Sequence, residues 1–221
     1  MPLQLAATSK RSGGDALRTV DNHHDASAIP LDVASPASGC LCRTAFDAPG
    51  VTSLLADAIW RCLGPHPEDT GGFLHIVCVG TDRSTGDALG PLVGSKLRPL
   101  VERERTIRLL GTLDEPVHAG NLARVMATVD HANPQRHPVL AVDACLGKAG
   151  SVGQITVNMG PLRPGAGVAK DLPPVGNVHI AGVVNVGGFM EYLVLQNTRL
   201  STVMRMADAI ARGIYTYVSG S

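Results

Sequence analysis

Residues 74–91, LHIVCVGTDRSTGDALGP, contain a short apolar run that ends at a glycine and is followed by a polar loop. The run is rich in β-branched residues (Ile76, Val77 and Val79), which predicts a buried strand. Gly90-Pro91 then indicates the first turn of a helix, where proline is tolerated. A buried strand followed by a helix is typical of an α/β fold. Open α/β sheets carry their sites beyond the carboxyl ends of the strands.

The rest of the chain alternates between the apolar spacing of helices and short apolar runs. Such alternation predicts right-handed crossovers and a mainly parallel sheet. The pattern predicts helices over residues 51–63, 89–103 and 122–129, helical segments over 189–195 and 200–214, and strands over 74–79, 106–110, 139–142, 153–158 and 178–184.

Length and composition bound the class of protein. A chain of 221 residues with 44% hydrophobic residues suits one core, and we expect a single domain over residues 49–221. Residues 1–48 lack a sustained period and are rich in Ser, Ala, Asp, Gly and Pro, so we expect a flexible N-terminal extension. The formal charge is zero, which argues against nucleic acid and membrane surfaces as partners.

Without a long apolar run or a secretory signal, the sequence predicts a cytoplasmic protein. It leaves the oligomeric state open.

The loop after the first strand does not have a phosphate-binding motif. Gly80, Gly86 and Gly90 are six and four residues apart, whereas a dinucleotide site needs G-x-G-x-x-G. Two carboxylates in the loop would also repel a phosphate. We therefore look for chemistry that uses the carboxylates themselves.

Asp87 and Asp143 each lie just beyond a predicted strand, and neighbouring strand ends would bring them together. Two close carboxylates cannot both ionise easily, so one keeps its proton and the pair can act as general base and general acid. The same pair could hold a divalent cation, although the sequence requires no cofactor. Aspartate after a strand is also a good helix cap, so the spacing leaves these alternatives open.

Four ordered segments carry a resemblance to a known family: GTDRSTGDALGP (80–91), AVDACLG (141–147), PGAGVAKDLPPVGNVHIAGVVNVGGF (164–189) and EYLVLQNTRLS (191–201). Together they resemble the YyaC family of sporulation proteins. That family is in turn similar to the germination protease, which degrades small acid-soluble spore proteins. The resemblance implies a three-layer αβα sandwich of the phosphorylase/hydrolase-like kind, located in the cytoplasm of the forespore or the spore core.

The resemblance also implies roles for individual residues. Asp87 and Asp143 match the proposed acid/base pair of the germination protease, an atypical aspartic peptidase. Gly165 and Gly167 match its glycine-rich loop, which would flank the site and shape access for a protein or peptide substrate. The carboxylate pair would then be catalytic, and small acid-soluble spore proteins would be the expected substrates.

Three further residues are candidates for substrate binding. Asp82 has a loop position from which it could face the cleft, or it could close an Asx-turn after Gly80. Lys170 could meet the developing oxyanion, or simply pair with Asp171. Asn185 could donate a hydrogen bond to the substrate.

Two other functions stay open at this point. The hydrogenase maturation endopeptidases are more distant relatives, and they contact their metal through two carboxylates and a histidine. The first two would fall on Asp87 and Asp143, but Asn185 stands where the histidine would be, and a carboxamide is a poor nickel ligand. The second alternative is a noncatalytic sporulation protein with the same fold, because a shared scaffold does not establish activity.

Overall fold

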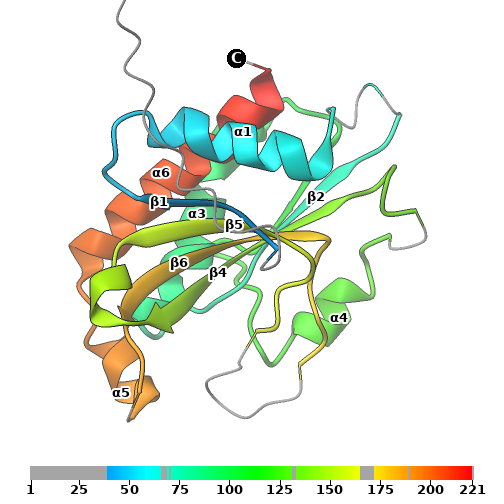
Figure 1. Cartoon of the computed structure of the whole chain (residues 1–221). Coiled ribbons are helices and arrows are strands. Elements are labelled where there is room, and N and C mark those ends of the chain that lie inside the picture. The colour runs from blue at the N-terminus through cyan, green and yellow to red at the C-terminus, as the bar shows by residue number, and fades with distance from the viewer. Residues whose placement is uncertain are drawn as a thin grey trace, which may run out of the picture. The chain divides into compact units, whose positions relative to one another are not determined.

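Six strands form one sheet in the order β1-β5-β6-β4-β2-β3 in this computed structural model (Figure 1). Strands β2, β3, β4 and β6 are parallel, β5 is antiparallel to β6, and β1 is antiparallel to β5. All strands except β5 therefore run in one direction, which confirms the mainly parallel sheet. The strands are β1 (Cys40–Ala45), β2 (Leu74–Cys78), β3 (Ile107–Leu110), β4 (Val139–Gly147), β5 (Gln154–Met159) and β6 (Val178–Val186).

The structure describes residues 39–65, 69, 71–130, 133–164, 172–188 and 190–220. Gly165, Gly167 and Lys170 lie outside these residues, and so does the predicted extension up to residue 38. Within the described part of the chain, no helix is long and apolar enough to cross a membrane.

Helices cover both faces of the sheet, as the three-layer αβα prediction requires (Figure 1). On one face lie α1, α3 and α6, and on the other lies the short α4. The helices are α1 (Val51–Leu63), α3 (Leu89–Val101), α4 (Leu122–Met126), α5 (Glu191–Gln196) and α6 (Leu200–Ser219), with short 3₁₀ turns η2 (Gly86–Ala88) and η3 (Ala149–Ser151).

The central strands are buried on both sides because successive side chains point to opposite faces. In β2, Ile76 and Cys78 pack in the cluster under α1, α3 and α6, whereas Val77 packs in the cluster under α4. The same division separates Leu140 and Val142 from Val139 and Ala141 in β4. This double burial explains why these strands read as continuous apolar runs rather than as alternating ones.

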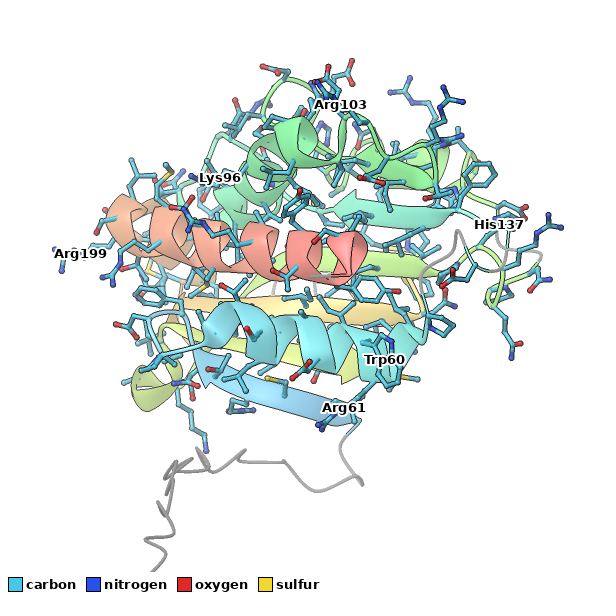
Figure 2. The ribbon with its side chains drawn as sticks, turned by 90° about the horizontal axis from the view of Figure 1, so that it is seen from above. Trp60, Arg61, Lys96, Arg103, His137 and Arg199 are labelled. Atoms are coloured by element: carbon cyan, nitrogen blue, oxygen red, sulfur yellow. The ribbon has the colours of Figure 1, made fainter. Side chains whose placement is uncertain are left out.

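Helices α1 and α6 lie side by side over the sheet (Figure 2). Their close approach depends on Gly213, because a Cβ there would lie only 2.7 Å from the Leu55 Cβ. On the other side of α6, Lys96 of α3 forms an ion pair with Asp208 at 2.7 Å. The three helices therefore form one layer that holds β2, β4 and β6 in place from one face.

Two predicted boundaries need correction. Cys40–Ala45 forms the edge strand β1, so residues 40–45 belong to the sheet and not to a flexible extension. Strand β4 does not stop before Asp143 but continues to Gly147, because residues 143–147 pair with the end of β6. Asp143 is therefore held within a strand, with paired backbone on either side of it.

Candidate functional site

The loop after β2 folds back on itself through two glycines. Gly80 has φ +144°, and a Cβ there would lie 2.1 Å from the backbone oxygen of Asp87. The neighbouring Thr81 N–H donates to this same oxygen at 3.1 Å. Gly90 is equally crowded, since its Cβ would lie 1.9 Å from the Val79 oxygen. Only glycine lets the start of α3 lie this close to the end of β2, and this closeness positions Asp87.

Asp87 lies in the 3₁₀ turn η2, immediately before α3, and is half-buried. Burial raises the pKa of its carboxyl group, and the nearby Ser84 hydroxyl opposes that rise. Ser84 itself is buried, and its Oγ has no partner of good hydrogen-bond geometry among the residues that the structure describes. The Ser84 hydroxyl is therefore a close neighbour of Asp87 that favours its charged form.

Asp143 extends from β4 on the same face as Val139 and Ala141, the face that α4 covers. Its Oδ1 accepts a hydrogen bond from the Ala144 N–H at 2.8 Å. Burial raises the pKa of Asp143 to about 8, the Ala144 hydrogen bond opposes this, and the charge of Asp87 raises it further. The residue as a whole is half-buried.

The two carboxyl groups act on one another electrostatically because their strands are neighbours. Strand β2 pairs with β4 in parallel, with Cys78 opposite Val142, so the loop that carries Asp87 leaves the sheet beside Asp143. With a pKa of about 8, Asp143 is mainly protonated at pH 7. The pair therefore offers one group that can give a proton and a second that can take one.

Asp82, predicted to face the substrate, is exposed in the same loop. The Arg83 N–H donates to the Thr81 hydroxyl at 3.3 Å and supports this turn. The side chain that closes the turn is therefore Thr81, whereas the Asx-turn alternative gave this contact to Asp82. The substrate-binding role of Asp82 stays a prediction.

Asn185, predicted to contact the substrate, lies near the end of β6 and connects this strand to α5 through hydrogen bonds. Its Nδ2 donates to the Val194 oxygen at 3.1 Å and to the Thr198 hydroxyl at 3.2 Å, and its Oδ1 accepts from the Val186 N–H at 2.9 Å. The structure thus gives Asn185 a positioning role, and its predicted contact with the substrate stays a prediction. Sequence reasoning missed this connection because Thr198 lies 13 residues away and carries no motif of its own.

Helix α5 in turn covers the turn that carries Asp87. Leu195 packs against Gly86, where an added Cβ would lie 2.6 Å from the Leu195 Cδ2. The contacts from Asn185 to α5, and from α5 to η2, therefore connect the end of β6 with Asp87. This contribution of Leu195 was also missed from the sequence, where it reads as one more apolar helical residue.

The donor set fits a metal centre poorly. In the part of the chain that the structure describes, no group of three or more His, Cys, Asp and Glu side chains is arranged to hold a metal ion. At the position that the maturation endopeptidases give to histidine, the Asn185 amide is engaged with α5 and the β6 backbone. The residues present support proton transfer between carboxyl groups better than coordination of a transition metal.

Comparison with known proteins adds the family. Residues 57–213 match the family described as "Protein of unknown function (DUF1256)". "Uncharacterized protein YyaC" from Bacillus subtilis (strain 168) is 55% identical over 141 residues, which are 63% of this chain and 66% of that protein. A [NiFe] hydrogenase maturation protease HycI from Thermococcus kodakarensis KOD1 has a similar structure with a TM-score of 0.45 and 18% identity, covering 66% of this chain and 92% of that one.

Proposed function

We propose that this chain, which belongs to the DUF1256 family, is a peptidase that uses Asp87 and Asp143 to activate a water molecule. The observation that carries the proposal is the electrostatic interaction of two partly buried carboxyl groups whose pKa values are both raised. A pair that titrates in this way suits general acid/base work near neutral pH.

The proposed roles follow from the difference between the two environments. Asp143 has a pKa of about 8 and acts as the general acid, whereas Asp87 acts as the general base. Asp87 takes a proton from the water as its oxygen attacks the peptide carbonyl carbon, and Asp143 gives its proton to the carbonyl oxygen. When the C–N bond breaks, Asp87 passes its proton to the leaving amine and Asp143 recovers one from the tetrahedral intermediate. Both groups then return to their starting states.

The substrate class rests on the resemblance noted in the sequence. The segment containing T-G-D-A-L-G-P and the apolar run ending in D-A resemble the elements that carry the acid/base pair in the germination protease. We therefore propose that the substrates are proteins or peptides of the spore, with small acid-soluble spore proteins as the first to test.

The test is incubation of the purified protein with small acid-soluble spore proteins, followed by mass spectrometry of the products. Wild type is compared with Asp87→Asn and Asp143→Asn, and Asp57→Asn serves as a control that removes an exposed carboxylate from α1, outside the predicted site. We expect cleavage by wild type and by the control, and at least a 100-fold loss in the two site variants.

Equal absence of cleavage in all four proteins would favour the noncatalytic alternative. Cleavage that survives both site substitutions would remove the carboxylate pair from the reaction. Cleavage by wild type that a chelator abolishes and a divalent cation restores would replace the mechanism with a metal-dependent one.

A further inference from the structure

Strand β4 is longer than its neighbour β2, and its last five residues have a partner strand on one side only. Pairing with β2 ends at Val142, whose oxygen still accepts from the Val79 N–H at 2.7 Å just after β2. The next residue, Gly80, donates its N–H to the Val117 oxygen at 2.8 Å, so the chain turns away from β4. In the part of the chain that the structure describes, no strand pairs with residues 143–147 on the β2 side.

The exposure of β4 changes where its pairing with β2 stops. Residues 139–142 are buried, whereas residues 143–147 are all partly exposed. On the other side, β6 pairs with this segment as far as Gly147, so the segment keeps the extended conformation of a strand. Residues 143–147 therefore form an open strand edge, and the first residue of this edge is Asp143.

The backbone groups of a strand point alternately to its two neighbours, and two hydrogen bonds fix this alternation in β4. The Val142 oxygen faces β2, because it accepts from the Val79 N–H. The Gly147 oxygen faces the other way and accepts from the Gly187 N–H, just after β6, at 2.8 Å. The backbone groups of the even-numbered residues 144 and 146 therefore face the open side.

The open edge has main-chain groups available for a further strand. The Ala144 N–H donates to its neighbour Asp143 Oδ1 at 2.8 Å, a side chain that the proposed mechanism uses for proton transfer. Among the described residues, no backbone group bonds to Ala144 or Leu146 on the open side. Unpaired N–H and C=O groups at a sheet edge are a template for an extended chain, which presents the same groups at the same two-residue spacing.

We propose that the open edge binds an extended segment of the substrate polypeptide, which adds a strand to the sheet beside Asp143. The inference rests on the proposed peptidase function and names its substrate class, a polypeptide segment without folded structure that is recognised through its main chain. A substrate carbonyl replaces Asp143 Oδ1 on the Ala144 N–H, which leaves the carboxyl group to face the scissile bond. Because the turn η2 also contacts β4, a bond held at this edge lies near Asp87 as well.

The experiment measures the binding of short fluorescein-labelled peptides by anisotropy. The peptides overlap along a small acid-soluble spore protein, and the protein is Asp87→Asn, in which we expect cleavage to be blocked. The tightest peptide is then resynthesised with one backbone nitrogen methylated at a time, which removes a single main-chain donor and keeps every side chain. We expect methylation to weaken binding by about 10-fold at positions two residues apart, and by less than about twofold at the position between them.

A pair of variants at one position tests the same edge from the side of the protein. Leu146→Pro removes the N–H that faces the open side, and the matched control Leu146→Ala shortens the same side chain but keeps the N–H. In the Asp87→Asn background, Leu146→Pro should bind the peptide at least about fivefold more weakly than Leu146→Ala. The methylated peptides test the proposal without this substitution if Leu146→Pro does not fold.

The outcomes separate this inference from the peptidase proposal. Alternating losses on methylation without cleavage by wild type would support the edge and overturn the peptidase. Cleavage of a peptide whose binding is indifferent to methylation, or equally weakened at every position, would overturn the edge and leave the peptidase standing. Because main-chain recognition tolerates many sequences, failure of every peptide to bind would also overturn the edge. A dimer that Leu146→Pro dissociates in sedimentation, and Leu146→Ala does not, would assign the edge to a second copy of the chain and overturn the inference.

Discussion

Replacing Asp143 by Asn should change how the stability of the protein depends on pH. The folded state raises the pKa of Asp143 from 3.8 to about 8, so between these values the folded chain binds a proton that the unfolded chain releases. Stability therefore falls as pH rises through this window, and the loss is complete above about pH 8. Asparagine is neutral, keeps the Oδ1 acceptor for the Ala144 N–H and removes this source of pH dependence.

The size of the effect follows from the span of the window. Between the two pKa values, each pH unit changes the free energy of unfolding by about 1.4 kcal/mol. From pH 5 to pH 8 the change is therefore at most about 4 kcal/mol. Because Asp143 keeps some exposure to solvent, screening lowers our expectation to about 2 kcal/mol. The substitution also removes the repulsion between the two carboxylates, which further stabilises Asp143→Asn relative to wild type at high pH.

The assay is urea unfolding of wild type, Asp143→Asn and Asp82→Asn at pH 5, 6, 7 and 8. We expect the wild type and the Asp82 variant to lose stability relative to Asp143→Asn as the pH rises, with the gap widening by about 2 kcal/mol. Curves that stay parallel across this range would refute the reasoning, because they would mean that Asp143 titrates alike in the folded and unfolded chains.

Three further predictions concern residues that position the site or the core. Gly80→Ala should cost about 2 kcal/mol or more in urea unfolding and also reduce activity, because its Cβ would displace the backbone oxygen of Asp87. Asn185→Ala should cost about 2 kcal/mol in urea unfolding through the loss of its hydrogen bonds to Val194 of α5 and to Thr198 after α5. A cost no greater than that of the exposed Asn197→Ala would contradict this. Cys78 is fully buried with its pKa raised to about 12, so a thiol reagent should label it only on unfolding, unlike the partly exposed Cys62 and Cys145. Peptide mass spectrometry locates the label, and rapid labelling of Cys78 itself in the folded protein would count against its burial.

The central part of the fold could be predicted because its strands are buried on both faces. Run 139–142 is apolar throughout and run 74–79 is apolar apart from His75, so both strands can be predicted from the sequence without knowledge of the tertiary contacts. Strand β1 was missed although Cys40, Cys42 and Thr44 alternate with more exposed residues, because a Ser- and Pro-rich stretch precedes them. The continuation of β4 past Asp143 depends on pairing with β6, and no local propensity in D-A-C-L-G indicates it.

From the sequence, residues of the candidate site could be predicted only where their position relative to a strand indicates them. The proximity of Asp87 and Asp143 could be predicted because the strands that precede them in sequence were expected to be parallel neighbours, as β2 and β4 are. Their catalytic role stays a prediction. Ser84 could not be distinguished from the adjacent Thr85, since the effect of its hydroxyl on the pKa of Asp87 depends on how the turn folds. The connection from Asn185 to Thr198 and α5 depends on the packing of segments that share no motif.

The place of Asp143 within β4 explains why the two carboxyl groups should have different roles. A side chain with paired backbone on both sides has fewer ways to reach solvent than one in a loop, and burial is accordingly the largest cause of its raised pKa. Asp87 is in a 3₁₀ turn, where the Ser84 hydroxyl favours its charged form. If Asp143 is the acid, wild-type kcat/KM should fall on the alkaline side near pH 8. The residual activity of Asp143→Asn should then lose this alkaline limb and keep the acidic one, whereas Asp87→Asn should lose the acidic limb. The reverse pattern would exchange the two roles, and unchanged limbs in both variants would mean that the profile reports groups other than this pair.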